Sequence, residues 1–354
     1  MKQIDAHPNV YLDVTPTKAV VLLREPDRGR GEVTPALVSV ANRPLLIHAL
    51  DWLEEGGVRE VALVAGEQIA ERARDAVGNG SKRGARASWL YQVPGETLGE
   101  ALEALTGFLE HDPFVLHLAD SLPRNSFVRV LGDSDVADVG AVFLTHGSEP
   151  TLAPVVEIRG GRCLQRGEGA GVAVLGGGVI GTTANVDASP GSELRELANH
   201  LSGIGASVEF RNAEPWWRFS DAGETMLEGN RFALECLRGA PVTAVLRNSC
   251  IEGEVLIDPS ARIESSTVRG PAVIGPAVRL ESAYIGPFTS VGPNVLIEGA
   301  EVENSIILAG TSVTHLSTRL EGSVIGPGAR VFKDFRLPRA MRLNVGRGAK
   351  VAIS

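Results

Sequence analysis

The first two thirds of the chain alternate between two hydrophobic patterns. From Lys18 to about Ala240, short runs of β-branched and aliphatic residues are followed by segments whose apolar residues recur at helical spacing. Two apolar runs predict buried strands, at residues 19–23 (AVVLL) and 61–65 (VALVA). Between them a helix is predicted to begin at Pro44, and its apolar residues share one face. Strands that alternate with helices in this way predict an α/β fold with a mostly parallel, doubly wound sheet.

One strand of this region ends in a carboxylate. Residues 113–120 (PFVLHLAD) form an apolar run that finishes at Asp120. Ligands of open α/β sheets bind beyond the carboxyl ends of the strands. Asp120 is therefore expected to face the crevice in which a ligand of this domain would lie.

After about residue 245 the helical spacing disappears, and an apolar residue returns every five or six positions. Three steps add up to 17 residues, so residues 17 apart are expected on the same face of successive coils. This spacing predicts a left-handed parallel β-helix of hexapeptide repeats, with an irregular loop between about residues 307 and 320. The recurring positions are Ile251, Ile257, Ile263, Val268, Ile274, Leu280, Ile285, Val291, Ile297 and Val302.

The length and the change of pattern predict two folded domains. At 354 residues the chain is too long for one ordinary core, since domains average roughly 150 residues. We expect an N-terminal tail over 1–16, an α/β domain over 17–241, the β-helix over 242–336 and a basic C-terminal tail over 337–354.

The negative net charge of the chain argues against some classes of binding partner. A formal charge of −9 and a pI near 5.4 argue against a general binder of nucleic acids or of anionic membranes, because such proteins usually carry a positive surface. No apolar run approaches the roughly 18 residues that span a bilayer, and the N-terminal segment lacks the apolar core of a signal peptide. The three cysteines match no zinc-site spacing. We expect a cytoplasmic protein with no nucleic-acid or membrane partner.

Lysine is rare in this sequence. Of 34 basic residues only five are lysines, and Lys82 is the only lysine between residues 19 and 332. An arginine-rich composition by itself carries no functional information. It becomes informative where a site needs a compact ammonium group, because the planar guanidinium of arginine has a different geometry.

Six segments match the motifs of a known family: 38–50 (VSVANRPLLIHAL), 77–92 (VGNGSKRGARASWLYQ), 111–122 (HDPFVLHLADSL), 215–219 (PWWRF), 227–237 (LEGNRFALECL) and 281–310 in the repeat region. On these segments the chain resembles the sugar-1-phosphate nucleotidyltransferases, and in particular the long form of glucose-1-phosphate thymidylyltransferase. The resemblance runs from Lys18 to the end of the chain. It implies a Rossmann-like nucleotidyltransferase domain followed by a left-handed β-helix, and a place in nucleotide-sugar biosynthesis.

The resemblance also implies a reaction that needs a metal ion. In this family a sugar phosphate attacks the α-phosphorus of a nucleoside triphosphate and releases pyrophosphate, with Mg²⁺, cationic side chains and backbone N–H groups neutralising the phosphates. Two aspartates hold the Mg²⁺ in the family. Asp120 matches the first, whereas the second falls on Phe219, which cannot ligate a hard cation. Asp221, two residues later, substitutes only if its loop shifts.

The triphosphate-binding loop of the family is altered in this chain. Relatives follow their first strand with a glycine pair and a Gly-Thr-Arg run that wraps around phosphate. Here residues 24–35 read REPDRGRGEVTP, with Arg24 and Glu25 in place of the glycine pair. Two interpretations stay open: Arg28 and Arg30 contact phosphate as catalytic cations, or the segment is a solvated loop.

Neither of the family's two phosphate-binding lysines has a counterpart. The first falls at Pro35, and the stretch that corresponds to the second, 160–177, holds Arg166 but no lysine. Arg166 is therefore a candidate sugar-phosphate contact, with the different geometry of a guanidinium. Gly176 matches a sugar-facing backbone position; alternatively, the glycines around it widen the pocket or loosen a strand.

The base-recognition segment of the family is partly retained. Gln92, Leu98 and Gly99 match its nucleotide-binding residues, although the segment 92–99 (QVPGETLG) is one residue longer than usual. Leu98 and Gly99 also fit the start of a helix, and both interpretations stay open.

Together these changes predict a degenerate active site. Positioning and charge neutralisation make up most of phosphoryl-transfer catalysis, so losses at several places argue against ordinary turnover. The leading hypothesis is a protein that binds a nucleotide or sugar phosphate without a cofactor, and that regulates or partners an active nucleotidyltransferase paralogue in a homo- or hetero-oligomer. The alternative is an active enzyme that makes a nucleotide sugar, with Mg²⁺ on Asp120 and Asp221.

Overall fold

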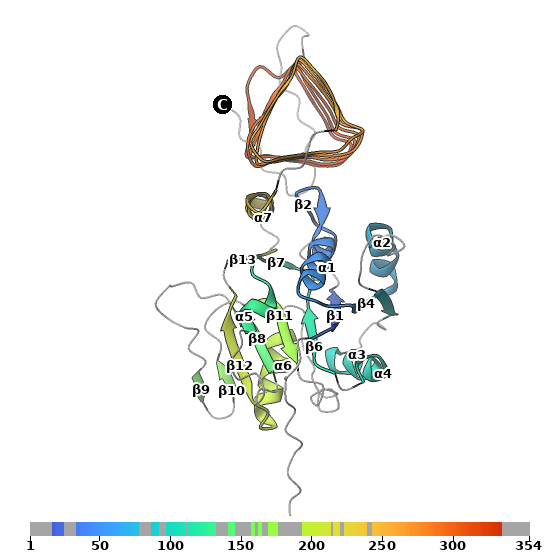
Figure 1. Cartoon of the computed structure of the whole chain (residues 1–354), viewed down its shortest axis with the longest axis vertical. Coiled ribbons are helices and arrows are strands. Elements are labelled where there is room, and N and C mark those ends of the chain that lie inside the picture. The colour runs from blue at the N-terminus through green and yellow to red at the C-terminus, as the bar shows by residue number, and fades with distance from the viewer. Residues whose placement is uncertain are drawn as a thin grey trace, which may run out of the picture. The chain divides into compact units, whose positions relative to one another are not determined.

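The structure is a computed structural model, and it forms two compact units (Figure 1). One unit contains the described residues up to Val38 and from Pro44 to Arg218, and the other contains Ser39–Arg43 and the described residues from Phe219 onward. No helix among the described residues is long and apolar enough to cross a membrane. The described residues are 16–24, 33–77, 86–91, 97–110, 112–131, 141–145, 157–159, 162–164, 169–175, 193–213, 215–219, 223–238 and 243–334.

A seven-stranded sheet forms the centre of the first unit. Its strands are β1 (Lys18–Leu23), β4 (Glu60–Ala65), β5 (Arg86–Tyr91), β6 (Phe114–His117), β8 (Ala141–Thr145), β11 (Gly169–Leu175) and β12 (Val208–Asn212). They are ordered β12-β8-β11-β6-β1-β4-β5. All neighbours are parallel except β11, which is antiparallel to both β6 and β8. The mostly parallel sheet predicted from the sequence is confirmed, with one antiparallel strand that the hydrophobic pattern does not reveal.

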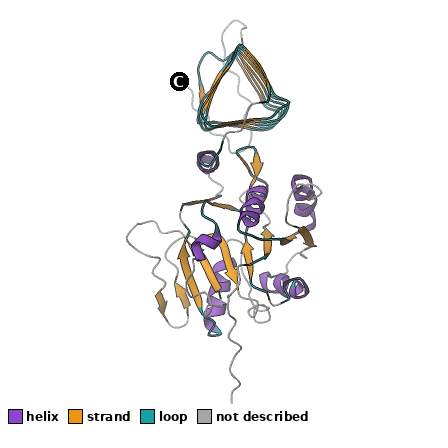
Figure 2. Ribbon diagram, viewed as in Figure 1, coloured by secondary structure: helices purple, strands orange, loops and turns teal. Residues whose placement is uncertain are grey.

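Helices cover both faces of this sheet (Figure 2). They are α1 (Leu45–Glu55), α2 (Glu67–Val77), α3 (Leu98–Ala104), α4 (Thr106–Leu109), α5 (Phe127–Leu131) and α6 (Glu193–Gly203). Alternate residues of β1 belong to different cores: Val21 packs in a core that includes α1 and α2, whereas Val20 packs in one that includes α3 and α6. A strand buried on both faces needs an unbroken apolar run, which is what residues 19–23 provide.

Short elements complete this unit and lead to the second one. Strand β7 (Ser121–Pro123) pairs antiparallel with β13 (Trp216–Arg218), and β9 (Glu157–Arg159) pairs antiparallel with β10 (Arg162–Leu164). A 3-10 turn, η1 (Pro35–Leu37), precedes the paired strands β2 (Ser39–Val40) and β3 (Arg43–Pro44).

Residues 243–334 form a three-sided coil of parallel strands (Figure 1). One side contains β14 (Val245–Arg247), β17 (Arg262–Glu264), β20 (Arg279–Glu281), β23 (Leu296–Glu298), β26 (Ser312–Thr314) and β29 (Arg330–Phe332). The second contains β15 (Cys250–Glu252), β18 (Thr267–Arg269), β21 (Tyr284–Ile285), β24 (Glu301–Glu303) and β27 (Leu320–Glu321). The third contains β16 (Val255–Ile257), β19 (Ala272–Ile274), β22 (Thr289–Val291), β25 (Ile306–Ile307) and β28 (Val324–Ile325). These sheets are consistent with the predicted β-helix, whose left-handed sense stays a prediction.

The strand register follows the 17-residue period read from the sequence. Ile251 pairs with Val268, Val268 with Ile285, and Ile285 with Val302, and the last three are fully buried. The next step differs, because Val302 pairs with Leu320, 18 residues later. The extra length falls within the segment 307–320, where the sequence predicts an irregular loop.

Helix α7 (Gly223–Glu235) and the segment Ser39–Arg43 pack with the coil in the second unit. Both lie within the range 17–241 that the sequence assigns to the α/β domain, and the exact domain boundaries stay a prediction. Asn230 of α7 is fully buried and joins the parts of this unit. Its Oδ1 accepts the backbone N–H of Ala41 at 2.9 Å and the hydroxyl of Ser290 at 2.5 Å, and its Nδ2 donates to the carbonyl of Phe288 at 2.9 Å.

We predict that Asn230→Ala weakens the packing of α7 and of residues 39–43 on the coil. The change leaves the N–H of Ala41 and the carbonyl of Phe288 without their side-chain partner, which costs about 2 kcal/mol. Hydrogen exchange of peptides that cover residues 39–43 should therefore become about 30-fold faster. The matched control is Glu228→Ala, an exposed position on the same helix. Equal exchange in the two variants would contradict the assigned role of Asn230.

Candidate functional site

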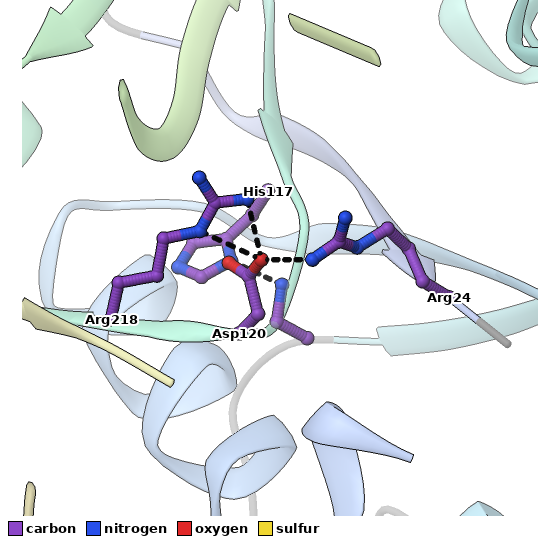
Figure 3. Close-up of polar contacts among 5 residues, drawn as sticks. Arg24, His117, Asp120 and Arg218 are labelled. Atoms are coloured by element: carbon purple, nitrogen blue, oxygen red, sulfur yellow. Dashed lines mark hydrogen bonds and ion pairs between the residues drawn. The ribbon is translucent and has the colours of Figure 1, made fainter. Parts of the chain in front are cut away.

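Asp120 lies just beyond β6 and is bound by two arginine side chains (Figure 3). Its Oδ2 accepts hydrogen bonds from Nη2 of Arg24 at 2.5 Å and from Nε and Nη2 of Arg218 at 3.0 and 2.9 Å. The carboxylate is fully buried, whereas the side chains of Arg24 and Arg218 are 15% and 21% exposed. We call these three residues the Arg24–Asp120–Arg218 cluster.

Three strand ends of the first unit bring the cluster together. Arg24 follows β1, Asp120 follows β6, and these strands are parallel neighbours whose carboxyl ends meet at one edge of the sheet. Arg218 is the last residue of β13, where it lies opposite Ser121 of β7. Asp120 therefore stands at the carboxyl edge of the sheet, as the hydrophobic pattern predicts.

A buried histidine holds the turn that presents Asp120. The backbone N–H of Ala119 donates a hydrogen bond to Nδ1 of His117 at 2.8 Å (Figure 3). Ala119 has a φ of 52°, in the left-handed region that residues with a Cβ rarely adopt. The ring of Trp52 packs edge-on against the His117 ring, with 5.6 Å between their centroids. His117 is thus a positioning residue for the turn that leads to Asp120.

Burial keeps the His117 ring uncharged near neutral pH. It lowers the pKa of His117 from 6.5 to about 4, and the nearby Asp120 carboxylate only partly offsets this effect. Because Nδ1 accepts a hydrogen bond, the proton of the neutral ring lies on Nε2. The charged groups of the three-residue cluster are therefore one carboxylate and two guanidinium groups.

The described residues around Asp120 do not fit a Mg²⁺ ion. Mg²⁺ needs oxygen ligands at about 2.0–2.1 Å and usually keeps several waters. Oδ2 of Asp120 is surrounded by guanidinium donors and is therefore engaged, whereas Oδ1 has no hydrogen-bond partner among the described residues and is the one carboxylate oxygen that a cation could still reach. The two arginines also repel a divalent cation. In the part of the chain that the structure describes, no three His, Cys, Asp or Glu side chains are grouped as metal ligands.

Leu98 and Gly99 are the other predicted site residues that the structure describes. They are buried and begin α3. A capping box precedes them: the Thr97 hydroxyl accepts the N–H of Glu100 at 3.2 Å, and the N–H of Thr97 donates to the Glu100 carboxylate at 2.7 Å. Leu98 also packs in the same core as Val20. These contacts explain both residues as the start of a helix, and their contact with a base stays a prediction.

The structure joins Asp120 to two arginines for which the sequence predicts no role in a site. In the sequence, Arg24 is notable only as a replacement for a family glycine, and no motif assigns a role to Arg218. The available signal is their position, since Arg24 directly follows a strand and Arg218 directly precedes Phe219. The remaining predicted site residues lie outside the described residues, and their roles stay predictions: Arg28, Arg30, Gln92, Arg166, Gly176 and Asp221.

We predict that Asp120→Asn destabilises the first unit by about 3 kcal/mol, because it removes the buried carboxylate that both Arg24 and Arg218 bind. Urea denaturation measures this loss. The matched control is Asp112→Asn, since Asp112 is a half-exposed carboxylate that pairs with Lys18 at 2.7 Å and should contribute less than about 1 kcal/mol. Similar losses of unfolding free energy in the two variants would contradict the larger contribution that we expect from the buried carboxylate.

We predict that His117 makes the protein sensitive to acid. Its pKa is lowered by folding, so its contribution to stability is complete above pH 6.5 and is lost as the pH falls toward about 4. His117→Asn removes the imidazole that gains a proton and keeps a hydrogen-bond acceptor. Between pH 6.5 and 4 the free energy of unfolding of this variant should therefore fall by about 3 kcal/mol less than that of the wild type. The matched control is His200→Asn, which removes a histidine of α6 and leaves His117 in place. An unchanged profile in His117→Asn would refute the prediction.

Comparisons with known proteins agree with this architecture. The chain is 32% identical over 333 residues to a glucose-1-phosphate thymidylyltransferase of Streptomyces antibioticus, covering 90% of this chain and 93% of that protein. It is 31% identical to a glucose-1-phosphate thymidylyltransferase of Streptomyces griseus and 28% identical to the low-salt glycan biosynthesis nucleotidyltransferase Agl11 of Haloferax volcanii, each over the same shares of the two chains. No family model matches the chain.

A solved structure is similar in fold to part of this chain. It is a crystal structure of a Bacillus anthracis protein assigned as a glucose-1-phosphate thymidylyltransferase, with a TM-score of 0.51 and 16% identity. The match covers 63% of this chain and 98% of that one. The long alignments to the curated relatives carry the family assignment, and this chain therefore belongs to the sugar-1-phosphate nucleotidyltransferase family, with glucose-1-phosphate thymidylyltransferases among its relatives.

Proposed function

We propose that this protein is a catalytically degenerate member of its family. In this proposal it binds a nucleotide or a sugar phosphate, catalyses little or no nucleotidyl transfer, and acts as a regulatory paralogue. The observation that carries the proposal is the Arg24–Asp120–Arg218 cluster. The carboxylate that matches a family metal ligand is engaged by two arginines, and an oxygen that accepts three hydrogen bonds from guanidinium groups is a poor ligand for Mg²⁺.

The sequence around the cluster supports the same conclusion. Phe219 stands where the family has its second metal-binding aspartate, and Pro35 stands where it has a phosphate-binding lysine. Phosphoryl transfer depends on the placement of cations around the reacting phosphates. The changes at Phe219, at Pro35 and at Asp120 would therefore all weaken the transfer step. No cofactor is part of this proposal. The partner that it implies is an active nucleotidyltransferase, in a cytoplasmic homo- or hetero-oligomer.

A second function has separate support. The chain aligns with thymidylyltransferases over 90% of its length, and it retains Asp120. An active enzyme requires Mg²⁺ on Asp120 and Asp221, with Arg28, Arg30 and Arg166 in place of the family lysines. Its product would be a dTDP- or UDP-hexose. The arginines at Asp120 would have to leave the carboxylate before such a site could form.

Pyrophosphate release distinguishes these two functions. We expect the purified protein, given a panel of nucleoside triphosphates with glucose 1-phosphate and Mg²⁺, to release no more pyrophosphate than its Asp120→Asn variant. The Streptomyces antibioticus relative serves as the positive control. Turnover by the wild type that the Asp120→Asn variant loses would refute the degenerate function and support the active enzyme.

The binding role is tested separately by thermal unfolding. A nucleotide or glucose 1-phosphate at a hundredfold excess over its Kd should raise the melting temperature by about 5 °C, because it binds only the folded protein. Stabilisation without turnover supports the proposed function. Absence of any shift with every nucleotide and sugar phosphate in the panel contradicts the binding role.

A further inference from the structure

One side of the three-sided coil carries exposed charges in two columns. On β17 and β20 the middle residue is buried, and the two residues that flank it are an exposed arginine and an exposed glutamate. The strand register pairs Arg262 with Arg279 and Glu264 with Glu281. Neighbouring strands lie about 4.8 Å apart, so like charges stand side by side in each column. We call these four side chains the Arg–Glu face.

The side chains of the Arg–Glu face make no ion pair with any part of the chain that the structure describes. The adjoining side of the same coil differs. There Arg269 pairs with Glu252 of the preceding turn of the coil at 2.9 Å. Arg319 pairs with Glu301 at 3.1 Å and with Glu303 at 2.7 Å. The coil can therefore pair arginine with glutamate between neighbouring strands, whereas the register of the Arg–Glu face sets like charges next to each other.

This order of charges is unfavourable within one chain but suits two chains. Neighbouring like charges repel each other, and exchanging the arginine with the glutamate on one of the two strands would instead pair all four charges within the chain. Each strand carries its positive charge at the first position and its negative charge at the third, about 6.6 Å further along. A second copy of the same strand that runs over it in the opposite direction therefore meets the opposite charge at both positions.

We infer that the Arg–Glu face binds a second copy of this chain. A two-fold axis parallel to the direction in which the strands stack reverses the strands of the partner and keeps each strand at its own height. Arg262 then meets the partner's Glu264, and Arg279 meets the partner's Glu281. By symmetry the two glutamates meet the partner's arginines, which gives four ion pairs between the copies. The inference rests on the homo-oligomer of the proposed function and names the surface through which it forms.

The two ends of the same sheet add apolar surface. Val245 on its first strand and Phe332 on its last strand are 52% and 58% exposed, and they are the two most exposed large hydrophobic side chains among the described residues. In the two-fold arrangement Val245 lies against the partner's Arg247, and Phe332 lies against the partner's Arg330. The methylene groups of an arginine can cover an aliphatic side chain, and its guanidinium can cover an aromatic ring.

The fourth strand of the sheet, β23, adds no unpaired charge. Its first residue is Leu296, and the Glu298 carboxylate lies 3.4 Å from Nε2 of His315. With two outward residues on each of six strands, the face is smaller than the roughly 20–30 residues that each side of a standard interface uses. We therefore expect a reversible dimer whose specificity comes from charge complementarity, with a Kd of about 10 µM.

Sedimentation velocity of the full-length protein tests the inference. At about 100 µM the wild type should sediment as a dimer of the 37.3 kDa chain. The acidic variant, R262E/R279E, should raise the Kd at least about hundredfold, because it places carboxylates against the partner's glutamates. The basic variant, E264R/E281R, should do the same by placing guanidinium groups against the partner's arginines.

A mixture of the acidic and basic variants gives the sharpest comparison. Each variant alone should be monomeric, whereas an equimolar mixture should form dimers at least as tightly as the wild type, since every facing pair then has opposite charges. Pairing that returns only on mixing requires direct contact between the two faces. The matched control, R72E/R195E, makes the same change of net charge as the acidic variant at exposed positions of α2 and α6, and its Kd should stay within about threefold of the wild-type value.

The salt dependence of the wild type is a test that needs no variant. Raising the salt concentration from about 0.1 M to about 1 M shortens the range of charge interactions from about 10 Å to about 3 Å, and it should weaken the dimer at least about tenfold. A wild type that stays monomeric at about 100 µM overturns the inference. So do a dimer that the acidic variant leaves unchanged, a mixture that does not pair, and a particle of three chains.

The outcomes separate the interface from the proposed function. A monomeric wild type contradicts the homo-oligomer, and it leaves the binding of a nucleotide or sugar phosphate and the hetero-oligomer with an active paralogue intact. A dimer that behaves as expected but gains no thermal stability from any nucleotide or sugar phosphate supports the interface and contradicts the binding role.

Discussion

The ion cluster at Asp120 connects three segments at the carboxyl edge of the sheet in the first unit. A fully buried carboxylate is costly unless opposite charges and hydrogen bonds surround it, so its partners must be held in place by the fold. They come from the ends of β1 and β13, about a hundred residues away in sequence from Asp120. Backbone hydrogen bonds pair β1 with β6 and β13 with β7. The ion pairs of Arg24 and Arg218 with Asp120 add a second connection between these two pairs of strands.

The parts of the fold that follow local rules could be predicted from the sequence. The run 19–23 predicts a strand buried on both faces, and the 17-residue period predicts which residues of the coil lie above one another, as Val268 and Ile285 do. Each prediction needs only neighbouring positions and the geometry of one element. The antiparallel direction of β11 is set by how distant segments return to the sheet, which no local pattern records.

The site was harder to predict for the same reason. Asp120 is visible because it ends an apolar strand, but the two arginines that bind it are 96 and 98 residues away. Similarly, Ala41 and Asn230 are 189 residues apart and meet through one hydrogen bond in the second unit. Family motifs indicated where ligands should be missing, at Phe219 and Pro35, yet a motif comparison cannot state which new charge meets the residue that remains.

Retention of Asp120 is therefore weak support for retained catalysis. Once a buried carboxylate loses its metal, the fold tolerates it only if something else neutralises it, and substitution by arginine next to the strand end is one such change. After that change the arrangement depends on the carboxylate, because Asp120 is the buried anion that both arginines bind. An aspartate can then persist at a family metal position for reasons of stability. The groups that surround the carboxylate, more than its own identity, indicate which chemistry the site retains.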